Sequence, residues 1–227
     1  MSFELSQPPR VAGYPTRRLH LRFGDIRVDL LTVKRLEDYV DTDALLRDPD
    51  APEPPYWAHL WTGSRALARV VATEIACTGK RVVEVGCGLG LVGIVAALRG
   101  ATVTLLDSAW QGACFAAANA ALNGSTARVM QSDLRAPGLR GVFDYCLAAD
   151  VTYDPALQQA LAAFLAGHLS PGGRLWCAES VRTVDSGFRR ACEAHRLVVS
   201  ERELREAEDG RNVPVRLTEV TRAPEPP

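Results

Sequence analysis

The sequence predicts an α/β fold in which a mostly parallel sheet carries helices on both faces. From Arg81 onward, strand-like apolar runs alternate with helical runs, and this order is typical of a parallel sheet with helical crossovers. The last two strand-like runs have no helix between them, so we expect the sheet to close with a C-terminal antiparallel hairpin. The 227 residues, 47% hydrophobic and 23% charged, suit one globular domain with a substantial core.

Two segments precede the sheet. Residues 17–33, "RRLHLRFGDIRVDLLTV", contain two alternating runs around Gly24 and predict an N-terminal β-hairpin. Residues 47–57, "RDPDAPEPPYW", are dense in proline and aspartate and predict an extended connector. The domain boundaries that we expect are 1–55 for the hairpin and connector, as an appendage of the same domain, 56–222 for the main domain, and 223–227 for a disordered tail.

Apolar periodicity predicts the remaining elements in order. Helices are expected over 61–75, 89–100, 108–124 and 155–169, and strands over 81–85, 102–107, 127–133, 143–150, 173–180, 197–204 and 213–222. Thr62 or Ser64 is expected to cap the first helix. Asn119 and Asn123 lie on the helix that Gly124 is expected to end, and we assign neither asparagine a catalytic role.

Composition excludes several classes of function. A formal net charge of −1 and a pI near 6.4 give no bulk attraction to nucleic acid or to an anionic membrane, and neither is expected as a partner. The six cysteines form no C-x-x-C pair and the four histidines are scattered, so no metal site is expected. The N-terminus lacks a signal-peptide pattern, and no apolar run reaches the ~20 residues that span a bilayer. We therefore expect a cytoplasmic protein.

A glycine-rich turn follows the first parallel strand, in "VVEVGCGLGLVGIVAALRG" (82–100). It lies where open α/β sheets bind ligands, and Gly86, Gly88 and Gly90 let a ligand approach the backbone. The segment from Gly88 to Gly93 also matches G-x-G-x-x-G, a dinucleotide-binding pattern. That match is weak, because Gly93 falls inside a helical run where close packing against the sheet is its expected role.

Carboxylates at three strand ends favour S-adenosylmethionine over a dinucleotide. Glu84 suits a cationic ligand group better than a pyrophosphate, and S-adenosylmethionine carries both a sulfonium and an ammonium. Asp107 is positioned for ribose hydroxyls, and Asp133 for an adenine amino group. The chain also has no room for the separate substrate domain of most dehydrogenases, so a methyltransferase fits better.

Several motifs together resemble a known family. The segments "VVEVGCGLG", "TVTLLD", "QSDL" and "AADVTYD" are similar to those of seven-stranded, Rossmann-like (class I) S-adenosylmethionine-dependent methyltransferases. The segments "PYWAHLWTGSRALARVV" and "ADVTYD" further resemble a subgroup, the Asp-x-x-Tyr protein lysine methyltransferases, which includes the enzyme that modifies the electron transfer flavoprotein β subunit. The subgroup has a Leu-Trp-Pro-Gly-Gly-like segment, whereas residues 60–64 here lack the proline and one glycine. The resemblance implies that Trp61 packs against the cofactor.

These arguments define a candidate cofactor site. Its expected residues are Trp61, Glu84, Gly86, Cys87, Gly88, Gly90, Asp107, Ser108, Asp133, Leu134 and Asp150. Cys87 is expected to be a small spacer rather than a nucleophile, because methyl transfer requires no thiolate and no histidine is near it in sequence.

Asp150 and Tyr153 are the candidate catalytic residues. Methyl transfer is an in-line displacement, so the enzyme must position a neutral nucleophile opposite the sulfonium. Asp150 would bind an incoming lysine ammonium and orient the amine, and Tyr153 would add a ring face to a narrow channel. The alternative is that Asp150 or Asp154 caps the helix that starts near Pro155; we favour the cap for Asp154 and function for Asp150.

The predicted function is methyl transfer to an amine, with a lysine side chain of a protein as the acceptor. A small-molecule amine is the alternative substrate, because this scaffold hosts many substrates. A non-catalytic module that only binds an adenosine ligand is the alternative outside enzymes, and Asp150 to Tyr153 argue against it, because a pure binder has no need of them.

Overall fold

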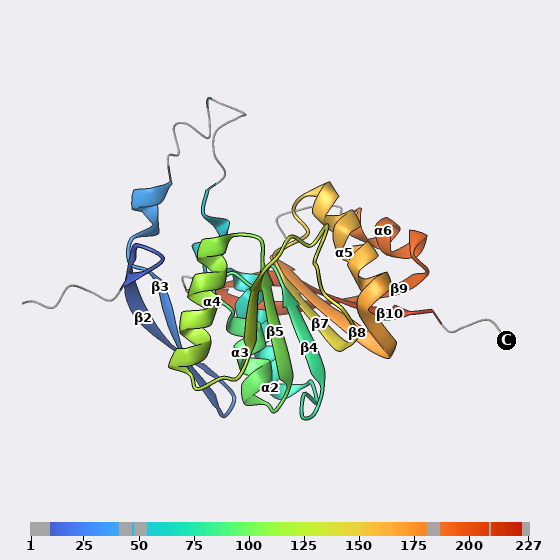
Figure 1. The fold of residues 1–227 in the computed structure, drawn as a ribbon, viewed down its shortest axis with the longest axis horizontal. Coiled ribbons are helices and arrows are strands. Elements are labelled where there is room, and N and C mark those ends of the chain that lie inside the picture. Colours follow the sequence, from blue (N-terminus) through green and yellow to red (C-terminus); the bar gives the residue numbers. More distant parts are fainter. Residues whose placement is uncertain (1–9, 41–46, 48–53, 181–186, 209, 224–227) are drawn as a thin grey trace, which may run out of the picture.

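The alternating runs after Arg81 fold into a seven-stranded sheet, seen in the computed structural model (Figure 1). The residues that the structure describes are 10–40, 47, 54–180, 187–208 and 210–223. The strand order is β6-β5-β4-β7-β8-β10-β9. The strands are β4 (Arg81–Val85), β5 (Thr102–Asp107), β6 (Arg128–Gln131), β7 (Phe143–Ala149), β8 (Leu169–Ser180), β9 (Leu197–Glu208) and β10 (Arg211–Arg222).

The direction of the strands confirms the predicted fold class. Strands β4 to β8 pair in parallel, and β10 runs antiparallel to both β8 and β9. The β9–β10 hairpin is the expected C-terminal antiparallel hairpin. The order reverses between β4 and β7, and such a switch point opens a crevice at the carboxyl ends of the strands.

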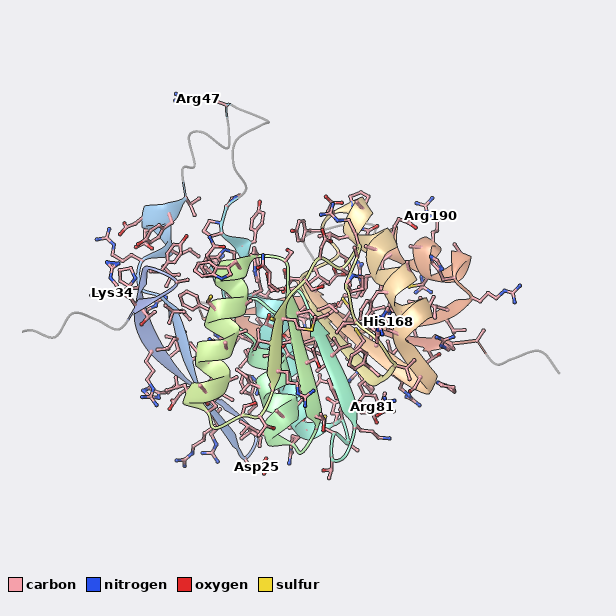
Figure 2. All side chains as sticks on the ribbon, in the orientation of Figure 1. Asp25, Lys34, Arg47, Arg81, His168 and Arg190 are labelled. Atoms are coloured by element: carbon pink, nitrogen blue, oxygen red, sulfur yellow. The ribbon has the colours of Figure 1, made fainter. Side chains whose placement is uncertain are left out.

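The N-terminal hairpin is also present. Strands β2 (Tyr14–Phe23) and β3 (Ile26–Val33) pair antiparallel around a two-residue turn in which Gly24 has a φ of 60°. A short strand, β1 (Arg10–Val11), pairs with β2. Arg81 is the first residue of β4, so it marks the edge of the sheet where the parallel strands have their amino ends. The turn at Asp25 lies toward this same edge in Figure 2. The hairpin turn therefore points away from the ligand-binding edge.

The predicted extended connector at 47–57 ends in a short helix, because Tyr56 and Trp57 belong to a 3-10 helix. Two short 3-10 helices, η1 (Leu36–Tyr39) and η2 (Tyr56–Ala58), flank the proline-rich connector. Residues 48–53 of that connector lie outside the described residues, as do 1–9 and residues 224–227 of the tail predicted at 223–227. The boundaries at 55 and 222 therefore remain predictions.

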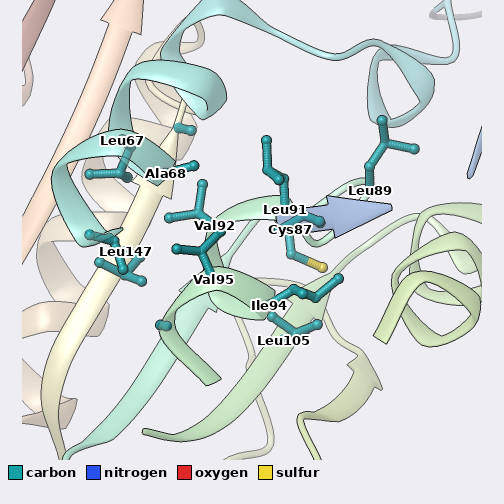
Figure 3. Close-up of a cluster of buried hydrophobic side chains, with 14 of the residues drawn as sticks. Leu67, Ala68, Cys87, Leu89, Leu91, Val92, Ile94, Val95, Leu105 and Leu147 are labelled. Atoms are coloured by element: carbon teal, nitrogen blue, oxygen red, sulfur yellow. The ribbon is translucent and has the colours of Figure 1, made fainter. Parts of the chain in front are cut away.

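Helices cover both faces of the sheet (Figure 1). The helices are α2 (Thr62–Thr73), α3 (Leu91–Leu98), α4 (Trp110–Leu122), α5 (Pro155–His168) and α6 (Phe188–Ala194). Helices α2, α3 and α4 share one apolar core with the β2–β3 hairpin, and Figure 3 shows Leu67 of α2, Val92 of α3 and Leu147 of β7 within it. Helices α5 and α6 build a second core on the other face. The sequence pattern did not indicate α6, which has only seven residues.

The helix ends test the predicted caps. Asp154 caps α5, because its Oδ1 accepts hydrogen bonds from the backbone N–H groups of Ala156 (2.5 Å) and Leu157 (3.4 Å). The predicted cap on α2 is wrong: Trp61 is the N-cap residue, and its side chain makes no capping bond. Thr62 lies inside the first turn, where its hydroxyl donates to the carboxylate of Glu208 instead.

Gly93 confirms the expected close packing of α3 on the sheet. A β-carbon at this position would overlap the side chain of Leu105 and would lie 2.8 Å from Oε2 of Glu84. Helix α3 can approach β4 and β5 this closely only with glycine at this position. Gly167 of α5 is a helical glycine in a different setting, with no atom within 4 Å of an added β-carbon.

We predict opposite effects of alanine at these two glycines. Gly93→Ala should lower the free energy of unfolding by about 1–3 kcal/mol, because the added methyl overpacks the α3–sheet contact. Gly167→Ala should raise it by up to about 1 kcal/mol, because alanine favours the helix and meets open space. Urea unfolding of both variants measures the difference, and a stabilised Gly93→Ala protein would contradict the packing described here.

Candidate functional site

A cleft lies at the carboxyl ends of the parallel strands, at the switch between β4 and β7. It collects the loops that follow β4, β5, β6 and β7, together with η2 and the start of α2. The predicted site residues that line it are Trp61, Gly86, Cys87, Gly88, Asp107, Ser108, Asp133, Leu134, Asp150 and Tyr153. The other two, Glu84 and Gly90, are buried and do not line it.

The glycine turn is held in a conformation that favours glycine. Gly86, Gly88 and Gly90 have φ values of 61°, 48° and 77°. A β-carbon on Gly88 would lie 2.8 Å from the carbonyl oxygen of Trp57. One on Gly86 would lie 2.5 Å from Cγ1 of Val151. The glycines are therefore required by the packing of the protein itself as well as by any ligand that approaches the turn.

Glu84 supports the turn from below. Its side chain is 3% exposed, and Oε2 accepts a hydrogen bond from the backbone N–H of Gly93 in the first turn of α3 (2.7 Å). Helix α3 has no local capping side chain, because its N-cap residue is Gly90. The pKa of Glu84 is raised to about 8, chiefly by burial and to a smaller extent by the nearby Asp107, against the opposing effect of the backbone N–H groups of Gly93 and Val92.

Asp107 joins two loops at the end of β5. Its Oδ2 accepts from the backbone N–H of Gly88 (2.6 Å), and its Oδ1 accepts from that of Ala109 (2.8 Å), where α4 begins. Burial raises the pKa of this carboxyl, against the effect of the two N–H donors. Each carboxylate oxygen can accept more than one hydrogen bond, so Asp107 retains capacity toward the cleft that it lines.

Asp133 differs from the buried carboxylates, because it is paired at the surface. Its two oxygens accept from Nε and Nη2 of Arg135 at 2.8–3.1 Å, and its side chain is 42% exposed. These hydrogen bonds with Arg135 lower the pKa of Asp133. An exposed ion pair contributes little to stability, so this pair can rearrange at small cost. Ser108 and Leu134 flank Asp107 and Asp133 on the cleft wall.

The side chain of Asp150 accepts hydrogen bonds from two different elements at this edge. Its Oδ2 accepts from the backbone N–H of Gly63 in the first turn of α2 (2.9 Å), and its Oδ1 accepts from the backbone N–H (2.9 Å) and hydroxyl (3.0 Å) of Ser180. Its φ is 51°, an uncommon conformation for a residue other than glycine. The alternative that Asp150 caps the helix near Pro155 is wrong, since Asp154 does so and Asp150 serves α2.

Gly63 is the retained glycine of the segment at 60–64. A β-carbon there would lie 2.5 Å from the carbonyl oxygen of Ala178 and would overlap Oδ2 of Asp150. The start of α2 therefore reaches Asp150 only because residue 63 has no side chain. The resemblance to a glycine-containing motif pointed to Gly63. Its partner, Asp150, lies 87 residues later and could not be predicted from the sequence.

Glu179 is a site-supporting residue that the sequence analysis missed. Its Oε1 accepts from the backbone N–H (3.2 Å) and the hydroxyl of Thr152, in the loop between Asp150 and Tyr153. Burial raises the pKa of Glu179 to about 7, and the neighbouring charge of Asp150 adds to the effect. The sequence did contain one indication of this role, because Glu179 is a charged residue at the carboxyl end of β8.

Aromatic rings gather at the mouth of the cleft. The ring of Tyr56 lies 5.7 Å from that of Tyr153 and 6.2 Å from that of Trp61, measured between centroids. Tyr56 and Tyr153 are 40% and 54% exposed. Trp61 is held in place by a hydrogen bond from its Nε1 to the carbonyl oxygen of Tyr56 (3.0 Å) and by the ring of His59 at 4.6 Å. Tyr56 and His59 line the cleft as well and were not predicted.

Cys87 is buried within the turn, with 6% of its surface exposed. Burial raises the pKa of its thiol well above the usual value, and the nearby carboxylates Glu84 and Asp107 raise it further. The protonated thiol is a poor nucleophile, as expected of a spacer.

Comparisons with known proteins agree with the predicted family and fold class. Residues 56–201 match the family model described as the methyltransferase small domain. Two zebrafish (Danio rerio) proteins match over part of the chain: an electron transfer flavoprotein β-subunit lysine methyltransferase, 32% identical over 49% of this chain and 44% of its own, and the protein N-lysine methyltransferase METTL21A, 42% identical over 44% and 48%. The chain thus spans about half the length of the curated relatives that it matches.

Solved structures share the fold. The magnesium protoporphyrin IX methyltransferase of Synechocystis with bound S-adenosylmethionine aligns with a TM-score of 0.57 and 20% identity over 70% of this chain and 78% of its own. A Thermus thermophilus 16S rRNA methyltransferase aligns with a TM-score of 0.63 and 14% identity over 95% of this chain and 52% of its own. The family and these neighbours, one also solved with S-adenosylhomocysteine, indicate S-adenosylmethionine as the cofactor.

The sequence predicted neither a nucleic-acid partner nor a membrane partner. The expectation that nucleic acid is not a partner has no support, because the structural neighbours include RNA methyltransferases. On the membrane question, none of the helices in the described part of the chain has the length and hydropathy needed to cross a bilayer.

The raised pKa of Glu84 predicts a specific pH dependence of stability. Because the folded-state pKa of about 8 exceeds the ordinary value of 4.5, the folded protein binds more protons than the unfolded chain between these values. The contribution of Glu84 to the free energy of unfolding should therefore fall as pH rises from about 5 to about 8. Glutamine cannot titrate, so Glu84→Gln should become more stable relative to wild type across this interval. Urea unfolding at both pH values measures the difference, and a pH-independent difference between the two proteins would contradict the assignment.

Proposed function

Because the chain belongs to the methyltransferase small domain family, we propose that it transfers the methyl group of S-adenosylmethionine to the side-chain amine of a protein lysine. The observation that carries the proposal is the meeting of Asp150 and the rings of Tyr56 and Tyr153 with the glycine turn in one cleft. A carboxylate beside exposed aromatic faces suits an alkylammonium. The two relatives named as lysine methyltransferases support this acceptor.

The cleft fits S-adenosylmethionine in charge and shape. Its carboxylates, Asp107, Asp133 and Asp150, suit a ligand with a sulfonium and an ammonium. Asp107 would hold the ribose hydroxyls and Asp133 the adenine amino group, with the Asp133–Arg135 pair opening to admit it. Trp61 would form one wall, and Gly86 and Gly88, which line the cleft without side chains, would adjoin the methionine part.

Glu84 has a different proposed role from the one expected from sequence. Since it lies beneath the turn and bonds to Gly93, it would act on the cofactor through the shape of the turn rather than by contact. Gly90 would likewise contribute through its left-handed conformation at the start of α3.

The bound cofactor supplies a methyl group activated by the sulfonium. Asp150 would attract the lysine ammonium and, after the ammonium has released a proton to solvent water, orient the neutral amine toward that methyl. The nitrogen lone pair forms the new C–N bond as the C–S bond breaks, which leaves S-adenosylhomocysteine and a methylated ammonium. Asp150 and the ring of Tyr153 then stabilise the product charge, and positioning supplies most of the acceleration. A cytoplasmic location stays a prediction from the sequence.

The acceptor is tested by transfer of a tritiated methyl group from S-adenosylmethionine into a lysate of the native host. The products are separated into protein, RNA and small-molecule fractions, and the labelled protein residue is identified by mass spectrometry. We expect label on protein lysine. Label confined to small amines would support the alternative substrate, and label confined to RNA would overturn the choice of an amine acceptor.

Substitutions at the acceptor side should separate catalysis from cofactor binding. Asp150→Asn should lower kcat by about a hundredfold at saturating cofactor, because it removes the charge that positions the amine. It should also lower stability, because the amide NH2 meets the N–H donors of Gly63 or Ser180. Tyr153→Phe should change kcat/KM by less than about twofold, whereas Tyr153→Ala should lower it by about 2–30-fold, the range of a cation–π contact.

Ser180→Ala is the matched control for Asp150→Asn. It removes the hydroxyl donor to Asp150 and keeps the carboxylate charge. If Asp150 acts mainly by its charge on the amine, Ser180→Ala retains most of kcat, and S-adenosylhomocysteine, which lacks the sulfonium charge, binds to both variants with little change in Kd. Equal losses of kcat in the two variants, in proportion to lost stability, would reduce Asp150 to a structural role.

A further inference from the structure

Asn119 is a buried polar residue that the proposed chemistry does not use. It lies on α4 with none of its surface exposed, in a stretch that otherwise consists of alanine and leucine. Its Oδ1 accepts from the backbone N–H of Leu31 (2.7 Å), and its Nδ2 donates to the carbonyl oxygens of Leu31 (3.2 Å) and Leu89 (3.0 Å). Both amide hydrogens are thereby used.

The two partners of Asn119 belong to distant parts of the fold. Leu31 is in β3 of the N-terminal hairpin, and α4 stands between that hairpin and the sheet (Figure 1). Leu89 is in the glycine turn and lines the cleft. One side chain therefore connects the hairpin to the cofactor turn across α4.

The contact with Leu89 orients a specific peptide unit. The Leu89 carbonyl shares its peptide plane with the N–H of Gly90, which donates to the carbonyl of Cys87 (2.7 Å) and closes the turn. Asp107 holds the other side of the turn through the N–H of Gly88. Loss of the bond from Asn119 would leave a buried carbonyl without that donor and free the peptide to rotate.

Asn123 makes the same contacts to the hairpin without the contact to the turn. Its Oδ1 accepts a hydrogen bond from the backbone N–H of Asp29 (2.8 Å), and its Nδ2 donates to the carbonyl oxygen of Asp29 (2.7 Å). Its Nδ2 also donates to the backbone carbonyl oxygen of Asn119, in the same helix (2.7 Å). Asn119 and Asn123 are four residues apart on the helix, a rise of about 6.0 Å, and Leu31 and Asp29 are two residues apart on the strand, a rise of about 6.8 Å. Because these lengths are similar, each asparagine lies beside its own residue on the edge of β3.

We propose that Asn119 is a positioning residue of the cofactor site, through which the β2–β3 hairpin stabilises the turn conformation that binds S-adenosylmethionine. The inference rests on the cofactor of the proposed function and is independent of the acceptor. Coupling between two sites is reciprocal, so cofactor binding also stabilises the docking of the hairpin on α4.

The paired variants Asn119→Ala and Asn123→Ala test the coupling. Each removes two hydrogen bonds to β3, but only the first removes the bond to Leu89. Calorimetry with S-adenosylhomocysteine should give a Kd raised by about fivefold or more for Asn119→Ala and changed by less than about twofold for Asn123→Ala. Thermal unfolding of both variants, in the same buffer, establishes that they are compared as folded proteins.

Amide hydrogen exchange on the wild-type protein tests the reverse direction and needs no variant. Saturating S-adenosylhomocysteine should slow exchange at the Leu31 amide by about fivefold or more, relative to amides of the β9–β10 hairpin, which control for global stabilisation. This measurement decides the matter if Asn119→Ala does not fold.

The outcomes distinguish the cofactor assignment from the role of Asn119. Wild-type protein that binds no S-adenosylhomocysteine would overturn the cofactor assignment and this inference with it. Wild-type protein that binds, with equal Kd values for the two variants or with Leu31 exchange unchanged, would overturn the role of Asn119 alone.

Discussion

Carboxylates at the ends of parallel strands hold the backbone N–H groups of the loops and helices above them, and the candidate site depends on these contacts. The N-cap residues of helices α2, α3 and α4 are Trp61, Gly90 and Ala109, and none of them makes a side-chain capping bond. Asp150 instead accepts from α2, Glu84 accepts from α3, and Asp107 accepts from the start of α4. One backbone N–H at or just before the start of each helix is thereby satisfied by a strand-end carboxylate, which also ties each helix to one strand end.

This arrangement places several acidic side chains in buried or partly buried positions. Burial raises the pKa values of Glu84, Asp107 and Glu179, so the ligand-free edge favours protonated carboxyls more than an exposed surface would. A cationic ligand would reverse this preference, because an opposite charge favours the ionised form. Of these three, Asp107 also lines the cleft, so the carboxyl that joins two loops is placed where a cationic ligand would bind.

Supports of the glycine turn come from three directions. Glu84 holds the helix that follows it, Asp107 holds Gly88, and Asn119 holds Leu89 from the side of α4 and the hairpin. The left-handed glycines have no side chains of their own to stabilise the turn, so its shape depends on these neighbours. The N-terminal hairpin is accordingly part of the frame around the cleft, although its own turn points to the opposite edge of the sheet.

The sequence by itself determined most of the helices and strands and the edge of the sheet where the site lies. Local signals sufficed for these: the strand-helix alternation after Arg81, the two-residue turn at Gly24, the cap at Asp154 and the stop at Gly124, whose φ is 62°. Most predicted site residues meet in one cleft, because parallel strands end at a common edge.

Only the tertiary structure decided which groups those residues bond to. Gly63 meets Asp150 87 residues away, and Asn119 meets Leu31 at a separation of 88. Glu84 and Gly90 turned out to lie behind the cleft wall, and Tyr56 turned out to face Tyr153. Periodicity and turn chemistry act over a few residues, whereas these contacts depend on how α2, α4 and the hairpin dock on the sheet. That docking is set by the packing of whole faces, which no single segment of the sequence specifies.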